Sequence, residues 1–166
     1  MTGLAIAGDQ QITESDIVAA QKAWGDALVA IAIAYDEEGE KRAREVAVET
    51  IERYYNHENG PSLFKPTLAQ EPQRFRTTDQ GAVAYFVGGD PEFPNDDGFA
   101  LKSWREVVVD NAAIFIDRNI GMSMGDVTLT DVDGNSVSVD KTWGFKKLDN
   151  GEVVIVLHHS SIPYTP

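Results

Sequence analysis

Apolar side chains recur at helical spacing in the first third of the chain. Across residues 18–35 they return every three or four positions, which is typical of an amphipathic helix. Thr13 is a suitable N-cap, and Asp16 stands three residues later, as in a capping box. We therefore predict a first helix over residues 13–36 and, from the same spacing, a second helix over residues 43–54.

Short extended fragments and a third helix come next. Residues 62–65 and 74–76 fit brief strands, the first of them closed by a proline. Thr78 is the expected cap of a third helix, which carries Tyr85 on its apolar face. Glycine, proline and aspartate are frequent in residues 88–98, which we interpret as a loop within the domain.

After Phe99 the pattern changes to the two-residue period of half-buried strands. We predict strands over residues 101–109, 113–117, 122–130, 136–146 and 152–161. Asp, Gly and Asn in the joints at 133–135 and 149–151 fit tight hairpins. Helices followed by an antiparallel meander indicate the α+β class. A strongly curved antiparallel sheet wrapped over the N-terminal helices forms a cone with one open end, and ligand sites favour such mouths.

The size of the chain fits one domain. With 166 residues and 42% apolar residues, it is long enough to bury a substantial core. We expect a flexible N-terminal segment over residues 1–11 and a single α+β cone domain over residues 12–166. Met1 to Gly8 has no basic region, so it is not a signal peptide as it stands. A remnant of an exported or plastid-targeted precursor fits residues 1–11 as well, and the sequence leaves the compartment open.

Composition excludes several classes of function. The formal net charge of −13 argues against nucleic acid and anionic membranes as partners, because both require clustered lysine and arginine. No apolar run approaches the roughly 20 residues of a membrane span. The chain has no cysteine, which excludes disulfides and thiolate-based catalysis or metal sites. A small uncharged substrate fits this acidic surface best.

The last predicted strand ends in the polar run His158-His159-Ser160-Ser161. Strand geometry places its even-numbered residues from 154 to 160 on one face and its odd-numbered residues from 155 to 161 on the other. Both faces are apolar until both become polar, so this end reaches either solvent or a polar cavity. The two histidines point to opposite faces, which argues against a zinc site that combines them with His57.

Two other acidic segments have simple interpretations. Residues 131–135 begin like a calcium loop, but the glycine comes too early and no glutamate follows at the twelfth position, so a hairpin turn is favoured. Asp140 is a candidate general base for an isomerase of the ketosteroid type, which shares a cone fold. Its strand-face neighbours Ser138, Thr142 and Gly144 are small or polar, which favours a solvated face instead.

The order of the elements resembles the nuclear-transport-factor-2-like superfamily. Within it, residues 156–163 are similar to the association domain of calcium/calmodulin-dependent protein kinase. The segments Leu63-Phe64-Lys65-Pro66-Thr67 and Tyr85-Phe86-Val87-Gly88-Gly89, together with the His-His-Ser-Ser ending, resemble the iota-class carbonic anhydrases of cyanobacteria and algae. The likeness covers nearly all of residues 13–164.

This resemblance implies a cavity in which Thr67, Tyr85, His158 and Ser160 line a bicarbonate site, in a class that includes members working without metal. No cofactor is expected. Spacing independently places His158 and Ser160 on one strand face. Our hypothesis is that water among the three hydroxyls attacks carbon dioxide and that His158 accepts or relays the proton, because its ordinary pKa of about 6.5 lies near working pH. The hydroxyls stabilise charge on the forming bicarbonate. Zinc, which lowers the pKa of water from 15.7 to about 7 in familiar carbonic anhydrases, has no ligand cluster in this sequence.

Two rival functions remain open at this point. One is a non-catalytic oligomerisation and small-ligand-binding module, in which Ile155 and Leu157 pack on a partner subunit. The other is an isomerase or cyclase that uses Asp140 as its base. A homodimer suits both the carbonic anhydrase and the binding module. In each case His159 is expected to serve packing or an interface rather than chemistry.

Overall fold

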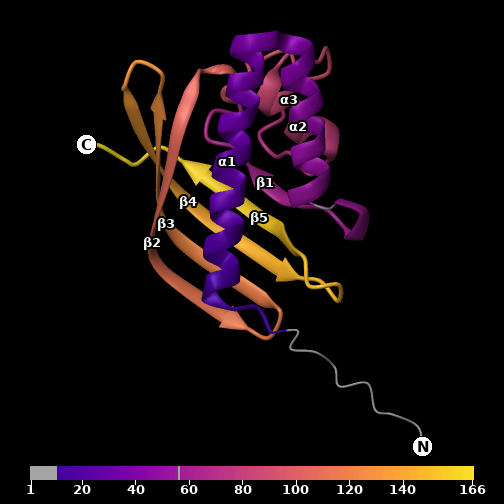
Figure 1. Ribbon diagram of the computed structural model, residues 1–166, viewed down its shortest axis with the longest axis vertical. Helices are drawn as coiled ribbons and strands as arrows, with labels where there is room; N and C mark the ends of the chain where they lie inside the picture. Colours follow the sequence, from indigo (N-terminus) through magenta and orange to yellow (C-terminus); the bar gives the residue numbers. More distant parts are fainter. Residues whose placement is uncertain (1–10, 56) are drawn as a thin grey trace, which may run out of the picture.

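Helices cover one face of a curved sheet in the computed structural model, which describes residues 11–55 and 57–166 (Figure 1). Over these residues the sheet has five strands in the order β1-β5-β4-β3-β2. The helix α1 crosses the sheet, α2 packs beside α1, and α3 packs on α2. The bounds are α1 Glu14–Glu38, α2 Glu40–Tyr54, α3 Asp79–Val87, β1 Leu63–Lys65, β2 Trp104–Asp117, β3 Ile120–Asp131, β4 Ser136–Lys147 and β5 Val153–Ser161.

The helix α1 begins as its sequence predicts. The hydroxyl of Thr13 accepts a hydrogen bond from the Asp16 N–H at 3.1 Å, and the Asp16 carboxylate accepts one from the Thr13 N–H at 2.9 Å. This capping box satisfies two of the amides that a helix start leaves unpaired. The helix is long and apolar enough to span a membrane, with a mean hydropathy of 1.5 over 18 residues. Trp24, Leu28 and Ile31 are nevertheless buried in the core, so α1 is a core helix here.

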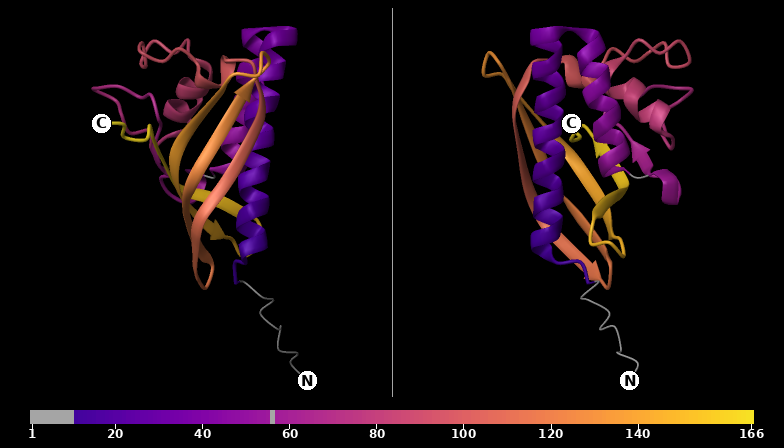
Figure 2. Two further views of the ribbon diagram at one scale, coloured as in Figure 1. Left: turned by 90° about the vertical axis from the view of Figure 1, so that its left-hand side faces the viewer. Right: turned by 45° about the vertical axis from the view of Figure 1, so that its right-hand side comes forward.

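The sheet differs from the predicted meander because its strand β2 is longer than predicted. The prediction of separate strands over 101–109 and 113–117 is wrong, because β2 runs unbroken through that region. A bulge near Asn111 absorbs the irregularity. It lies opposite Gly125, where a Cβ atom would come 2.0 Å from the carbonyl oxygen of Asp110. An extra residue of this kind bends a strand without ending its pairing, and Figure 2 shows the resulting curvature of the sheet.

The edge strand β1 pairs parallel with β5, whereas the other neighbours are antiparallel. Its register places Phe64 beside His158 and Lys65 beside His159. The predicted fragment over residues 74–76 is reduced to one bridge between Arg76 and Phe64. The parallel pairing brings the end of β1, and the residues after it, beside the polar end of β5.

A second bulge corrects the predicted faces of β5. Phe145 pairs with Ile155 and Gly144 with Leu157, so Val156 is an extra residue. Ile155 therefore joins the core with 2% exposure, although it was predicted on the face opposite His158. The shared inner face of His158 and Ser160 lies beyond the bulge, and both side chains are 1% exposed.

The described residues share one hydrophobic core between the helices and the sheet. Ile12, just before α1, belongs to this core, and its amide donates to the Arg118 carbonyl at 2.9 Å. Of the predicted flexible segment, residues 1–10 lie outside the described residues. The predicted single domain over 12–166 stays a prediction. The predicted α+β architecture is confirmed: a curved sheet wraps over the helices (Figures 1 and 2).

Candidate active site

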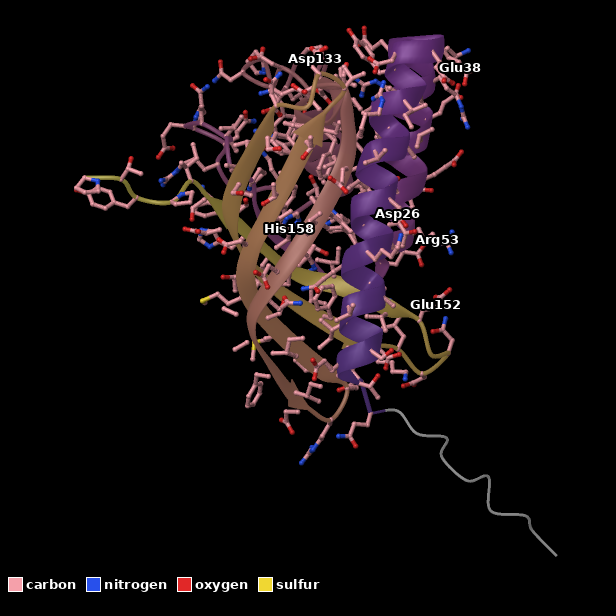
Figure 3. All side chains as sticks on the ribbon, turned by 60° about the vertical axis from the view of Figure 1, so that its left-hand side comes forward. Asp26, Glu38, Arg53, Asp133, Glu152 and His158 are labelled. Atoms are coloured by element: carbon pink, nitrogen blue, oxygen red, sulfur yellow. The ribbon has the colours of Figure 1, made fainter. Side chains whose placement is uncertain are left out.

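A small cavity lies where β1, β4, β5 and α3 meet. The structure brings all four predicted residues to its lining: Thr67, Tyr85, His158 and Ser160. Its volume of about 10 Å³ leaves room for about one water molecule. Aromatic side chains complete most of the wall, and Lys141 is also part of it. Figure 3 labels His158 at the level of the sheet, and its buried ring lies edge to face with that of Trp24 on α1, at a centroid distance of 5.3 Å.

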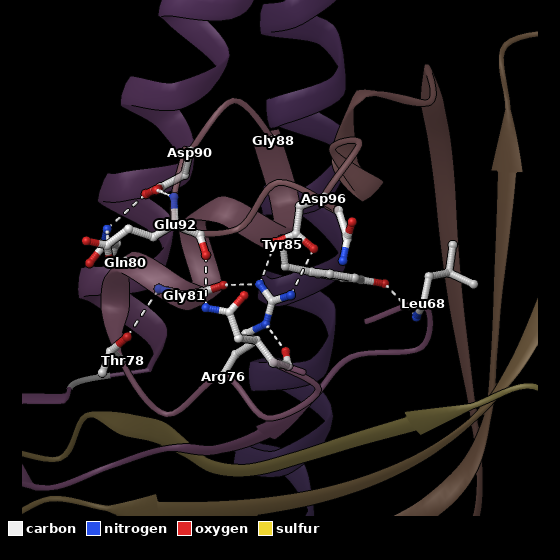
Figure 4. A network of polar contacts seen from close by, with 12 residues as sticks. Leu68, Arg76, Thr78, Gln80, Gly81, Tyr85, Gly88, Asp90, Glu92 and Asp96 are labelled. Carbon is white, nitrogen blue, oxygen red and sulfur yellow. Dashed lines mark hydrogen bonds and ion pairs between the residues drawn. The ribbon is translucent and has the colours of Figure 1, made fainter. Parts of the chain in front are cut away.

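Hydroxyl groups gather on one side of this cavity. The hydroxyls of Thr67 and Ser160 are 2.5 Å apart and share a hydrogen bond. The Tyr85 hydroxyl accepts a hydrogen bond from the Leu68 N–H at 3.3 Å (Figure 4). Burial raises the pKa of Tyr85, so its hydroxyl keeps its proton and can donate. This side of the cavity can therefore orient water or the oxygens of an anion.

A buried imidazole and a buried amine form the other side. The Nδ1 atom of His158 is 2.6 Å from the Tyr55 hydroxyl, and its Nε2 atom is 2.6 Å from Lys141 Nζ. The imidazole ring is stacked between Phe64 and Trp143, with centroid distances of 4.5 and 4.3 Å. Both ring nitrogens are thus occupied, and His158 has no free nitrogen for a substrate.

Burial shifts the pKa values of these basic groups downward. It lowers the pKa of Lys141 to about 7, because the protein interior solvates an ammonium ion poorly. Burial and the nearby Lys141 lower the pKa of His158 well below its ordinary value. The prediction that His158 titrates near working pH is therefore wrong. Of the two, Lys141 is the group that changes protonation near neutrality.

Comparison with known proteins identifies the family. A sequence model of metal-independent carbonic anhydrases matches residues 15–162. The chain is 54% identical over 156 residues to a metal-independent carbonic anhydrase of Nostoc sp. strain PCC 7120, a match covering 94% of this chain and 76% of the relative. The chain belongs to the metal-independent carbonic anhydrase family. It is thus an enzyme of the iota class.

Solved structures support the assignment of the chain to this family of carbonic anhydrases. A crystal structure of an iota-carbonic anhydrase from a cyanobacterium, complexed with bicarbonate, matches with a TM-score of 0.94 and 52% identity, over 100% of this chain and 99% of that one. A calcium/calmodulin-dependent protein kinase II association domain from Xanthomonas campestris matches with a TM-score of 0.59 and 22% identity, over 92% and 89% of the two chains. The second likeness shows a shared fold alone. The prediction of a carbonic anhydrase is confirmed, and the alternative of a non-catalytic binding module is not.

Sequence reasoning missed two residues that surround His158 in this carbonic anhydrase. Lys141 follows Asp140 on β4 and points to the opposite, inner face of the strand. Val139 and Trp143 lie on the same inner face. A lysine on an otherwise apolar strand face was the available signal. Tyr55, at the end of α2, has no comparable signal, since tyrosines are common in cores. Asp140 is exposed on the other face of β4, so it cannot serve this cavity as a base.

Two aromatic rings separate the cavity from a larger outer pocket. Tyr85 and Phe99 line both spaces, and their rings stack at a centroid distance of 5.5 Å. The outer pocket has a volume of about 200 Å³. Its rim is the loop over residues 88–98, which a buried ion pair between Arg76 and Asp96 holds in place (Figure 4). A molecule that enters the cavity from the outer pocket must pass these two rings.

His57 lies outside this cavity, in a turn that was predicted to be solvated. Its side chain is instead only 9% exposed, stacks on Tyr55 and contacts Asp79. With several acidic residues it lines a separate open cleft of about 600 Å³. Across residues 11–55 and 57–166, however, no three His, Asp or Glu side chains are arranged to hold a metal ion.

Proposed function

We propose that the small cavity is the site where this enzyme binds carbon dioxide and bicarbonate. Thr67, Tyr85 and Ser160 supply the hydroxyls that bind water and the substrate oxygens, and His158 acts behind them through its hydrogen bonds. One observation carries this proposal. Side chains from β5, α3 and the segment after β1 converge on a buried space, with three hydroxyls facing an imidazole–amine pair.

The chemistry of the walls suits the reaction. The cavity has room for about one water molecule, so its lining side chains must move apart to admit carbon dioxide beside a water held by the Thr67 and Ser160 hydroxyls. As the carbon–oxygen bond forms, negative charge develops on the oxygens of the former carbon dioxide. Neutral donors already in place, such as the Tyr85 hydroxyl, stabilise that charge without reorganising. Aromatic walls exclude bulk water, which strengthens each of these interactions.

The direct test measures carbon dioxide hydration by the purified chain, with and without exhaustive chelation. We expect the rate to survive chelation. Ser160→Ala removes one hydroxyl from the pair with Thr67 and is expected to lower kcat about a hundredfold, similar to the loss of one transition-state donor in other enzymes. Activity that disappears with the chelator and returns with zinc or manganese contradicts the proposal.

The outer face of the sheet supports a homodimer, with a second copy of this chain as partner. The register aligns Phe115, Met122, Gly144, Leu157 and Leu63 in one row across all five strands. Phe115 is 59% exposed, Met122 41% and Leu63 56%, so both ends of this apolar row are uncovered, whereas Gly144 in its middle is buried. Apolar patches of this kind mark interfaces.

Sedimentation velocity tests this arrangement. Met124 is 61% exposed and lies on the same face of β3, two residues along from Met122. Met124→Glu is expected to shift the wild-type dimer to monomer, because it places a charge in the proposed interface. Val18→Glu, at a 48% exposed position on α1, is the matched control and is expected to remain dimeric. A monomeric wild type, or a dimer that both variants retain, contradicts the proposal.

A further inference from the structure

Lys141 is a buried amine without an obvious structural purpose. Its residue is 5% exposed, and it lies on the inner face of β4, where it pairs in register with Ser160. Its Nζ atom lies 4.5 Å from the centroid of a Trp24 ring and 5.3 Å from that of Trp143. Burying a lysine costs free energy unless its charge is paired, and the residues that line the cavity include no carboxylate.

We propose that Lys141 is the base that takes the proton from the attacking water and, once protonated, is the counter-charge that holds bicarbonate. This inference rests on the proposed function of the cavity. It assigns two roles to one amine: a neutral role before the carbon–oxygen bond forms and a cationic role after it.

The hydrogen bonds around His158 favour the neutral amine in the resting site. Burial raises the pKa of Tyr55, so its hydroxyl keeps its proton. That hydroxyl already accepts from Trp24 Nε1 at 3.2 Å, and its own proton has the Nδ1 atom of His158 as acceptor. A neutral imidazole then carries its proton on Nε2 and donates it to Lys141 Nζ. Only a neutral amine has the lone pair to accept it.

The proposed step balances as a simple proton transfer. The oxygen of water forms a bond to the carbon of carbon dioxide, and one carbon–oxygen π bond becomes a lone pair on oxygen. The hydrogen bond from His158 Nε2 to Lys141 Nζ breaks, and a proton of the water moves to the freed lone pair of Nζ. The products are bicarbonate and an ammonium ion, so no free hydroxide has to form first. A base with a pKa of about 7 is well matched to this transfer near neutral pH.

The protonated amine then suits the product. A bicarbonate anion among neutral side chains would be poorly solvated, and an adjacent ammonium ion supplies the missing charge. The Trp24 and Trp143 rings stabilise the ammonium ion through their π faces. When Lys141 is charged, it can no longer accept from the Nε2–H of His158, so that hydrogen bond is lost while the ammonium group holds bicarbonate. Loss of this hydrogen bond favours return to the neutral amine after bicarbonate leaves.

The groups around Lys141 fit this interpretation. On β3 its partner in register is Gly125, which carries no charge. His158 and Ser160 face Lys141 from β5, Trp24 faces it from α1, and Tyr85 lies across the cavity on α3. None of these groups is an anion near neutral pH. The amine therefore has no resident counter-ion in the cavity lining, and bicarbonate is the anion that fills this place.

Calorimetry separates this proposal from a merely structural role. Bicarbonate is titrated into the wild-type protein near pH 8 in two buffers of different ionisation enthalpy. We expect uptake of nearly one proton for each bicarbonate bound, because Lys141 is mostly neutral before binding. The affinity should fall about tenfold for each pH unit above the pKa of free Lys141. Bicarbonate binding without proton uptake overturns the inference.

Two variants complete the test. Lys141→Met keeps a chain of similar length without the amine; we expect at least tenfold weaker bicarbonate binding without proton uptake, and a kcat about a hundredfold lower. Lys146→Met, on the same strand but the opposite face, is the control and should match wild type. Wild-type kinetics from Lys141→Met would overturn the inference. If Lys141→Met fails to fold, the wild-type proton uptake still decides. A wild type that neither hydrates carbon dioxide nor binds bicarbonate refutes the function of the cavity instead.

Discussion

This enzyme contains two pairs of buried polar side chains that differ in their chemistry. In one, the side chains of Arg76 and Asp96 are 2% and 4% exposed. In the other, Lys141 and His158 are 5% and 1% exposed. The first pair joins a cation to an anion, whereas the second joins two bases.

Hydrogen bonding explains the difference. Arg76 donates to the carbonyls of Gln73 and Gly81 and to the Asp96 carboxylate, so its guanidinium has a fixed set of acceptors. The hydrogen bond between Lys141 and His158 instead depends on whether the amine carries a proton, because only a neutral amine can accept from the Nε2–H of His158. Equal burial therefore produces an anchor for the loop over residues 88–98 in one place and a group able to exchange a proton in the other.

Breaking the ion pair between Arg76 and Asp96 should cause the largest loss of stability. Arg76→Met leaves the Asp96 carboxylate buried without its partner, which typically costs about 3–5 kcal/mol. Chemical denaturation of wild type and variant measures this loss. The double variant Arg76→Met, Asp96→Leu removes both charges and should recover part of the stability. A single variant as stable as wild type would show that the loop does not depend on the pair.

The pair of Lys141 and His158 should instead affect how the stability of the protein depends on pH. The folded protein holds the pKa of Lys141 at about 7, below the 10.5 of an unfolded lysine. Between these values the unfolded state binds more protons, so this residue makes stability rise with pH. From pH 7 to about 9.5 the contribution is roughly 2–3 kcal/mol. Denaturation midpoints for Lys141→Met should lack this rise relative to Lys146→Met, and parallel curves would contradict the shifted pKa.

A smaller effect is expected on the hydroxyl side of the cavity. Tyr85→Phe keeps the ring that stacks on Phe99 and removes only the donor. We expect kcat to fall about tenfold, with the melting temperature nearly unchanged. Tyr35→Phe, at a 38% exposed position, is the matched control. An unchanged kcat for Tyr85→Phe would remove this hydroxyl from the site.

The smallest effect concerns the histidine next to His158. His159 is exposed on the outer face of β5. We expect His159→Ala to leave kcat within about twofold of wild type and to change stability by less than about 0.5 kcal/mol, with any larger change appearing in dimer assembly. Steady-state kinetics and sedimentation measure both. Loss of activity in this variant would show that the inner face has been misassigned.

Local signals in the sequence predicted much of this architecture. The cap at Thr13 depends only on neighbouring residues, and the shared face of His158 and Ser160 follows from strand geometry over three positions. Pairing between distant segments was not predictable in this way. The parallel register of β1 with β5, which places Thr67 beside Ser160, is fixed by the packed core. Apolar residues on both faces of β5 also concealed the bulge at Val156.

That bulge has a consequence for the doubled polar motif. A slip of one residue exchanges the two faces of a strand. In most strands such a slip would remove the functional side chains from the site. Here it would replace His158 and Ser160 with His159 and Ser161, the same two residue types in the same order. The motif thus contains the pair twice, one residue out of phase, and the extra residue at Val156 selects which copy faces the interior.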